Sequence, residues 1–155
     1  MLLLDMTFIR VMQNEDLDRV YAIESAAYPT PWDRNTLRDC LLLGCDCRVL
    51  ERVLESVIEL AGFVICRYQA NTCHVLNLCV NPALQNKGYG QLLLQDVIDS
   101  CSASHIDSLL LDVRPSNTQA QHLYAKMGFQ YVRIKRGYYR DELGIENAIV
   151  LKKSI

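Results

Sequence analysis

The sequence predicts a mixed, twisted β-sheet with helices on both faces, an α/β class, from three observations. Strand and helix patterns follow one another in the order β-α-α-β-β-β-α-β-α-β-β. Three consecutive strands suit antiparallel pairing, whereas the later strands alternate with helices, as parallel connections require. The run Leu109-Leu110-Leu111 is apolar without alternation, as in a strand buried on both faces. A length of 155 residues fits a single domain, residues 1–155.

The first third of the chain predicts one strand and two helices. Thr7 to Gln13 alternates in hydropathy, and Asn14 is placed to cap a helix that continues to Ala27. The segment Tyr28-Pro29-Thr30-Pro31 ends that helix, because proline cannot continue it. Asp33 is placed to cap a second helix that runs through Leu42 and is closed by Gly44.

The remaining elements follow from the same patterns. Gly62 lies inside an apolar strand, so it predicts a bulge or a close backbone approach. The last two strands are expected to be joined by an irregular, tyrosine-rich connection. The predicted strands are Cys47 to Arg52, Ser56 to Gln69, Thr72 to Val80, Ser108 to Val113, Phe129 to Lys135 and Asn147 to Lys153. One predicted helix runs from Gln91 to Cys101, and another begins at Asn117 and is closed by Gly128.

Charge and composition exclude several classes of function. The net charge is −2 and no basic run occurs, which argues against a nucleic-acid-binding surface. The apolar residues 1–4 are followed by Asp5 and are too few for a signal peptide or a membrane span. We therefore expect a cytoplasmic protein with no membrane partner.

Seven cysteines are present, with no Cys-x-x-Cys pair. Cys45 and Cys47 share one face of a predicted strand, but no second cysteine or histidine pair stands at zinc-ligand spacing. We expect buried, reduced thiols and no metal, in a reducing compartment.

The segment from Gln85 to Gly90 predicts an anion site. It lies between an apolar strand and an amphipathic helix, and a helix start offers backbone N–H groups and positive potential to a phosphate. The dinucleotide fingerprint needs a third glycine where Leu93 stands, and a triphosphate loop needs its lysine after the glycines, whereas Lys87 precedes them. A plain tight turn is the alternative.

A second polar group is expected on the helix that begins at Asn117. Asn117 and Tyr124 are two turns apart and project from one stripe, next to a strand that ends near Asp112. The alternative is that Asn117 only caps the helix and Tyr124 only fills the core. The histidines at 74, 105 and 122 are expected to be structural or solvated.

Four segments together resemble the GCN5-related N-acetyltransferase family in order and spacing: Asn77 to Pro82, Gln85 to Gly90, Asp112 to Asn117, and Leu123 to Phe129. Pro31-Trp32-Asp33 and Tyr138-Tyr139 are similar to the substrate-facing segments of those members that acetylate the N-terminal alanine of a ribosomal protein. The resemblance implies the acyl-CoA N-acyltransferase fold, acetyl-CoA as cosubstrate and a ribosomal protein N-terminus as acceptor.

The resemblance also implies roles for individual residues. Leu78, Cys79 and Val80 would offer backbone groups to the pantetheine and thioester, and Trp32, Tyr138 and Tyr139 would face the acceptor. The cofactor pyrophosphate would rest on the segment Asn86, Lys87, Gly88, Tyr89, Gly90 and Gln91, with a further contact from Asn117.

The catalytic pair implied by the resemblance is Asp112 as proton acceptor and Tyr124 as proton donor to the leaving thiolate. Asp112 replaces a glutamate of the family, so it is one methylene shorter, and it would act directly, through a water molecule, or only by attracting the ammonium. Gly137 stands where similar enzymes carry asparagine. We expect direct attack on the thioester by a monomeric enzyme. The alternatives are acetylation of a small-molecule amine or lysine side chain, and a non-catalytic acyl-CoA-binding module.

Overall fold

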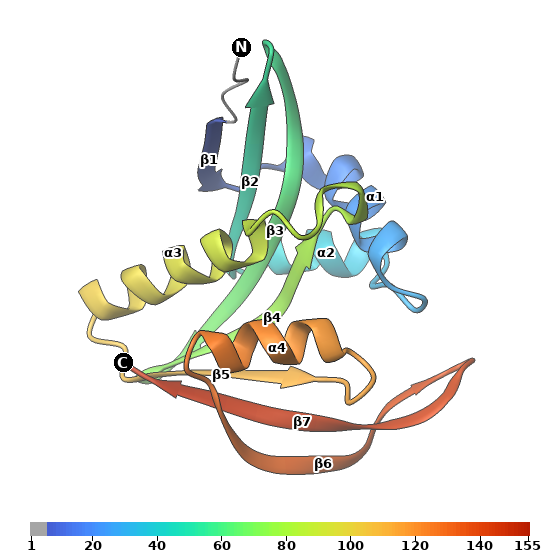
Figure 1. The fold of residues 1–155 in the computed structure, drawn as a ribbon, viewed down its shortest axis with the longest axis vertical. Coiled ribbons are helices and arrows are strands. Elements are labelled where there is room, and N and C mark those ends of the chain that lie inside the picture. The colour runs from blue at the N-terminus through green and yellow to red at the C-terminus, as the bar shows by residue number, and fades with distance from the viewer. Residues whose placement is uncertain (1–5) are drawn as a thin grey trace. The chain divides into compact units, whose positions relative to one another are not determined.

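A computed structural model describes residues 6–155 as a mixed sheet with four α-helices (Figure 1). The strands are β1 Met6–Val11, β2 Asp46–Leu54, β3 Val57–Gln69, β4 Thr72–Val80, β5 Ser108–Val113, β6 Gln130–Asp141 and β7 Gly144–Ser154. The helices are α1 Leu17–Ala27, α2 Arg34–Leu42, α3 Tyr89–Ala103 and α4 Thr118–Lys126, with short 3₁₀ helices η1 Asn14–Asp16 and η2 Pro82–Leu84.

Hydrogen bonds link the seven strands in the order β1-β2-β3-β4-β5-β7-β6. β4 and β5 are parallel, and β1-β2, β2-β3, β5-β7 and β6-β7 are antiparallel, so the predicted mixed sheet is confirmed. The apolar residues 1–4 lie outside the described residues. Within residues 6–155, the helices are all too short or too polar to cross a membrane.

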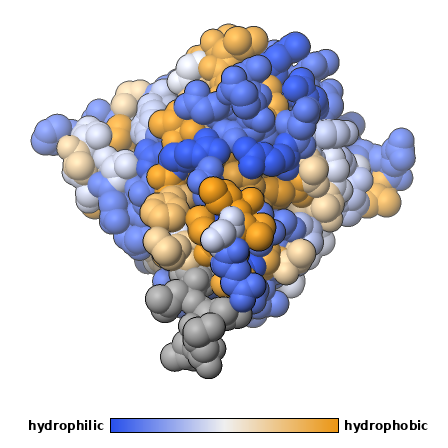
Figure 2. Space-filling model, turned by 90° about the horizontal axis from the view of Figure 1, so that it is seen from above, coloured by the Kyte–Doolittle hydropathy of each residue, from blue (hydrophilic) through white to orange (hydrophobic). Residues whose placement is uncertain are grey.

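The chain forms two compact units. The first comprises the residues up to Cys66 together with Asn77–Asp96, and the second comprises Arg67–Leu76 together with Val97–Ile155. In the first unit, the apolar face of α1 and the inward residues of β2 and β3 make up the core, where Leu17, Val49 and Phe63 are fully buried. On the face seen in Figure 2, hydrophobic and hydrophilic residues are interspersed.

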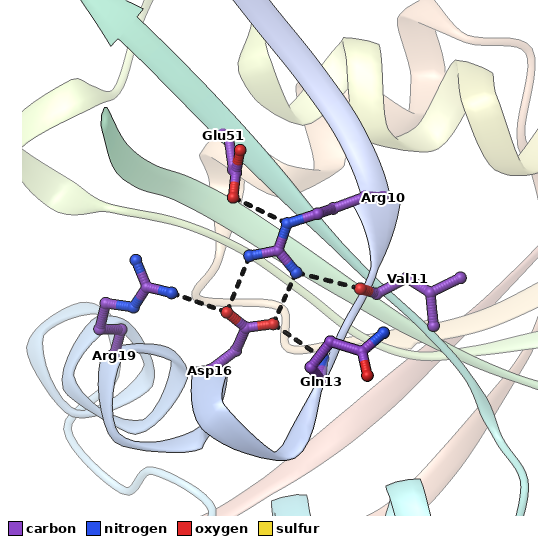
Figure 3. A network of polar contacts seen from close by, with 6 residues as sticks. All are labelled: Arg10, Val11, Gln13, Asp16, Arg19 and Glu51. Atoms are coloured by element: carbon purple, nitrogen blue, oxygen red, sulfur yellow. Dashed lines mark hydrogen bonds and ion pairs between the residues drawn. The ribbon is translucent and has the colours of Figure 1, made fainter. Parts of the chain in front are cut away.

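The start of the first helix differs from the prediction. The chain enters through η1, whose N-cap is Gln13, and the N-cap of α1 itself is Asp16 rather than Asn14. The buried Asp16 accepts a hydrogen bond from the Gln13 N–H at 2.7 Å and from the guanidinium groups of Arg10 and Arg19 (Figure 3). Hydrogen bonding to Arg10 lowers the pKa of Asp16 to about 2. Both arginines lie within six residues of Asp16, so these contacts are local in sequence.

Gly62 fulfils both expectations for its strand. The register of β2 with β3 shifts between Leu50 and Glu51, which face Gly62 and Leu60, so the strand bulges there. A Cβ on Gly62 would also lie 2.6 Å from the Cys79 carbonyl oxygen. Glycine therefore permits β4 to approach β3 closely at this point.

In the second unit, the first half of β4 pairs with β5, and β5 pairs with β7. Leu109 and Leu111 are buried, while Leu110 between them is half-buried. The expected irregular connection after Lys135 is wrong. β6 continues through both tyrosines to Asp141, and the chain returns as β7. The register of β6 with β7 shifts between Lys135 and Tyr139, at a bulge that contains Gly137 with φ of +58°, and pairing resumes beyond it.

Candidate active site

The outer end of β4, in the first unit, is held by the last turns of α1. The Tyr28 hydroxyl donates to the Leu78 carbonyl oxygen at 2.8 Å, and the Cys79 Sγ lies 3.9 Å from the Ile23 carbonyl oxygen. On the other side of the strand end, the Asn81 N–H donates to the Ala61 carbonyl at 2.7 Å. Cys79 is buried, and this burial raises the pKa of its thiol, which stays protonated. The predicted thioester-binding segment is therefore a fixed backbone surface without a reactive thiolate.

The glycine loop leads from η2 into α3 in the same unit. Asn86 and Gly88 have positive φ values of 63° and 83°, so the chain turns sharply before the helix. The intrahelical ladder begins with the Leu92 N–H donating to the Gly88 carbonyl at 3.1 Å. The helix thus starts at Tyr89, two residues before the predicted Gln91, because Gly88 itself accepts the first bond.

This geometry gives the loop the features of an anion site. The N–H groups from Tyr89 to Gln91 lie in the first helical turn, ahead of the ladder, where the helix dipole is positive. The Tyr89 side chain is buried, Lys87 is exposed, and a Cβ on Gly88 would meet no atom within 4 Å. Backbone N–H donors, open space and one mobile cation are the groups that a pyrophosphate requires.

Trp32 lies in the connection between α1 and α2, also in the first unit. Its N–H donates to the Glu24 Oε2 at 2.9 Å, and the side chain is half-buried. The next residue, Asp33, caps α2 as predicted, by accepting from the Thr36 N–H at 2.8 Å. The predicted substrate-facing segment is therefore fixed at both ends by carboxylates.

Asp112 lies near the end of β5 in the second unit and is half-buried. Its Oδ2 is 3.0 Å from the Lys135 Nζ, and the Lys135 ammonium is 4.8 Å from the centre of the Tyr138 ring. Burial and the Arg67 cation lower the pKa of His74, whose titration also responds to Asp112 and Lys135. Asp112 is thus paired with the Lys135 ammonium, which also lies over the Tyr138 ring.

Asn117 is the N-cap of α4, so the helix begins where predicted, and Tyr124 lies in its last turn. The Asn117 side chain accepts from the Ala120 N–H at 3.2 Å, so Asn117 does cap the helix. Tyr124 is 7% exposed, and its ring centre is 5.7 Å from that of Phe129. Gly128, with φ of +91°, ends the helix as expected. The capping and core roles named as alternatives are therefore present, and the expected roles with the cofactor remain predictions.

The two adjacent tyrosines of β6 have different environments. The Tyr139 ring lies 4.1 Å beneath the Arg114 guanidinium, which pairs with Asp141 and Glu146. Burial raises the pKa of Tyr139 to about 12. Tyr138 is 52% exposed and meets Tyr139 edge to face at 5.0 Å. Tyr138 is therefore the more accessible of the two to a substrate.

Sequence reasoning missed Glu24, Asn77 and Lys135. Glu24 stands seven residues after Leu17, at a core position of an amphipathic helix, so a carboxylate there was a detectable signal. Lys135 meets Asp112 only because β7 pairs with both β5 and β6. That contact joins residues 23 positions apart, so no local sequence pattern predicts it.

The seven cysteines form no disulfide, and five of them are buried as predicted, whereas Cys40 and Cys45 are half-buried. Among residues 6–155, no group of three or more His, Cys, Asp or Glu could hold a metal ion.

A mixed sheet with a glycine loop between a strand and a helix start has the fold and the kind of anion site that the resemblance to acyl-CoA-dependent acyltransferases implies. A family model described as "Acetyltransferase (GNAT) family" matches residues 17–129, and the chain belongs to this family. It is similar to ribosomal protein bS18-alanine N-acetyltransferases, at 34% identity for the Haemophilus ducreyi protein, over 92% of this chain and 97% of that one. The Escherichia coli K12 relative is 32% identical over 94% of this chain and 96% of its own length.

Solved structures agree with this assignment. The crystal structure of the ribosomal-protein-S18-alanine N-acetyltransferase from Escherichia coli has a TM-score of 0.86 at 30% identity, covering 97% of this chain and 94% of that chain. Arabidopsis thaliana NAA60 in complex with acetyl-CoA has a TM-score of 0.81 at 21% identity, covering 97% and 99%, and shows the shared fold.

Proposed function

We propose that this chain transfers the acetyl group of acetyl-CoA to the α-amine of the N-terminal alanine of ribosomal protein bS18. The observation that carries the proposal is similarity at 32–34% identity, over nine-tenths or more of both chains, to proteins named for that reaction. The structural neighbour at 30% identity carries the same name. As a setting, we propose a monomer in the cytoplasm that does not bind nucleic acid directly.

The glycine loop fits acetyl-CoA by the chemistry of its donors. Asn86 to Gln91 would hold the pyrophosphate through backbone N–H groups, with Lys87 as a mobile counter-charge. Leu78 to Val80 would bind the pantetheine and thioester, and a backbone N–H near Val80 would stabilise the developing oxyanion. Asn117 would add a contact through its amide.

The reaction needs one bond formed and one broken. The lone pair of the amine nitrogen attacks the thioester carbonyl carbon, and the carbon–sulfur bond of the tetrahedral intermediate then breaks. The α-ammonium, with an ordinary pKa of about 8, first loses a proton toward Asp112. Tyr124 gives its proton to the departing thiolate, whose conjugate thiol has an ordinary pKa of about 8.5.

Asp112 would act through a water molecule rather than directly. Its side chain is one methylene shorter than that of glutamate, and its Oδ2 already accepts a hydrogen bond from the Lys135 ammonium at 3.0 Å. The other carboxylate oxygen is left to orient a water that takes the amine proton. Trp32 and the exposed Tyr138 would bind the peptide. Tyr139, whose ring lies against the Arg114 guanidinium, would pack against Tyr138 and hold it in place.

The test measures CoA release with a panel of peptides that vary the first residues. The alanine-starting bS18 peptide should be turned over, and the same peptide with a blocked N-terminus should not, even when it contains an internal lysine as its only free amine. Tyr124→Phe and Asp112→Asn should each lower kcat by about 100-fold or more. Faster turnover of a small amine or of the lysine would favour the alternative acceptors. Tight acetyl-CoA binding without turnover would favour a binding module.

A further inference from the structure

Glu24 is a buried carboxylate that the proposed chemistry does not use. It is 2% exposed on α1, where an unpaired charge would be very unfavourable. Each of its oxygens accepts one hydrogen bond, Oε2 from the Trp32 N–H and Oε1 from the Asn77 Nδ2, both at 2.9 Å. Burial raises the pKa of Glu24.

The two partners of Glu24 belong to two functional segments of the first unit. Trp32 lies in the α1–α2 connection that is expected to face the acceptor. Asn77 immediately precedes Leu78 in β4, which is expected to hold the thioester segment. The Glu24 carboxylate therefore links the segment of Trp32, here called the acceptor side, to the β4 segment of Asn77 and Leu78, here called the acyl side.

The two segments depend on Glu24 to different degrees. β4 is also held by Tyr28 at Leu78 and by its own strand pairing. The Trp32 segment is an irregular stretch between α1 and α2 with a proline on either side of Thr30. Its two ends are held at Tyr28 and Asp33, and between them the Trp32 N–H bond to Glu24 ties its backbone to α1. Removal of the carboxylate should therefore shift the acceptor side more than the acyl side.

We propose that Glu24 is a positioning residue for the acceptor peptide: it fixes the backbone of Trp32 against β4 through the Trp32 and Asn77 hydrogen bonds. This inference rests on the proposed function. An unsatisfied buried N–H and a loosened segment should raise the KM for the alanine-starting peptide about tenfold, leaving the KM for acetyl-CoA within about twofold.

The experiment uses the full chain and three variants. Trp32 is the only tryptophan, so its fluorescence reports directly on this segment. Glu24→Ala should shift the Trp32 emission to longer wavelength and raise the peptide KM. Glu24→Gln retains a carbonyl that can accept from the Trp32 N–H, so it should restore most of both properties.

Asp16→Asn is the matched control. Asp16 is a carboxylate with the same 2% exposure, just before the opposite end of α1, and it is bonded to Arg10 and Arg19 (Figure 3). It should lower the melting temperature without changing the Trp32 emission or the peptide KM, when all variants are assayed below their melting temperatures.

Wild-type Trp32 emission and peptide KM in Glu24→Ala would overturn the proposal, as would equal changes in Asp16→Asn. If Glu24→Ala does not fold, Glu24→Asp takes its place, because it keeps the charge and shortens the reach to Trp32. If the unmutated chain fails to acetylate the peptide, the proposed function fails. The Trp32 emission of the variants still decides whether Glu24 fixes this segment.

Discussion

Replacement of Gly62 by alanine should damage stability and activity together, because the added methyl group meets backbone. The new Cβ would lie 2.6 Å from the Cys79 carbonyl oxygen, 3.2 Å from Leu93 Cδ1 and 3.3 Å from Val80 Cα. To lengthen the 2.6 Å distance to an ordinary contact of about 3.4 Å, β3 and the end of β4 must move roughly 0.8 Å farther apart. Neither strand can yield as a flexible side chain would.

The magnitude follows from this forced displacement. Overpacking of this kind lowers the free energy of unfolding by about 1–3 kcal/mol, which corresponds to roughly 2–12 °C in melting temperature for a chain of this size. The displaced Cys79 and Val80 belong to the proposed thioester segment, so kcat/KM should fall by about 10- to 100-fold.

Thermal unfolding and CoA release, measured on the same preparations, check this prediction. Gly44→Ala is the control, since its φ is +80° but no atom lies within 4 Å of the added Cβ. It should lower the stability by about 1–2 kcal/mol through backbone strain and leave the activity of the folded enzyme unchanged. A Gly62→Ala protein with wild-type melting temperature and kcat/KM would show that the added methyl group is accommodated without moving β4.

Three further predictions concern single side chains. Lys87→Ala should raise the KM for acetyl-CoA a few-fold with kcat unchanged, and the effect should shrink in high salt, because Lys87 is exposed; an equal loss in kcat would contradict a purely electrostatic role. Asn117→Ala should lower the free energy of unfolding by about 1 kcal/mol and raise the KM for acetyl-CoA, whereas Asn117→Ser should keep the helix cap and raise only the KM. Equal KM values in both variants and the wild type would leave Asn117 with capping alone. The folded-state pKa of Asp16 is depressed to about 2, so its stabilisation is present above about pH 4 and is lost as the pH falls toward 2. Acid unfolding curves should show a shallower pH dependence over that range in Asp16→Asn.

Local signals account for most of the elements predicted from the sequence. β4 and β5 have the predicted bounds, Asp33 and Asn117 cap their helices, and Gly128 ends α4. Each depends on hydropathy period or on the chemistry of one or two neighbouring residues. The strand, glycine loop and helix of the anion site are also contiguous in sequence.

Non-local contacts were beyond that reasoning. β6 continues past Gly137 because β7 supplies its hydrogen bonds, and the Gly137 N–H donates to the Asn147 side chain at 2.9 Å. The different exposures of Tyr138 and Tyr139 depend on Arg114, whose guanidinium lies over the Tyr139 ring.

Local periodicity and spacing were therefore enough to predict the class of fold, and they supply the residue types that the proposed anion site and acyl transfer would use. The tertiary structure decided what those residues contact. Asp112 faces Lys135 across the sheet, and Glu24 joins Trp32 to Asn77, because strand pairing and helix packing bring together residues 23 and 53 positions apart. Burial of the Glu24 carboxylate at a core position of α1 would be unfavourable without hydrogen bonds, and folding brings the two donors that form them to it.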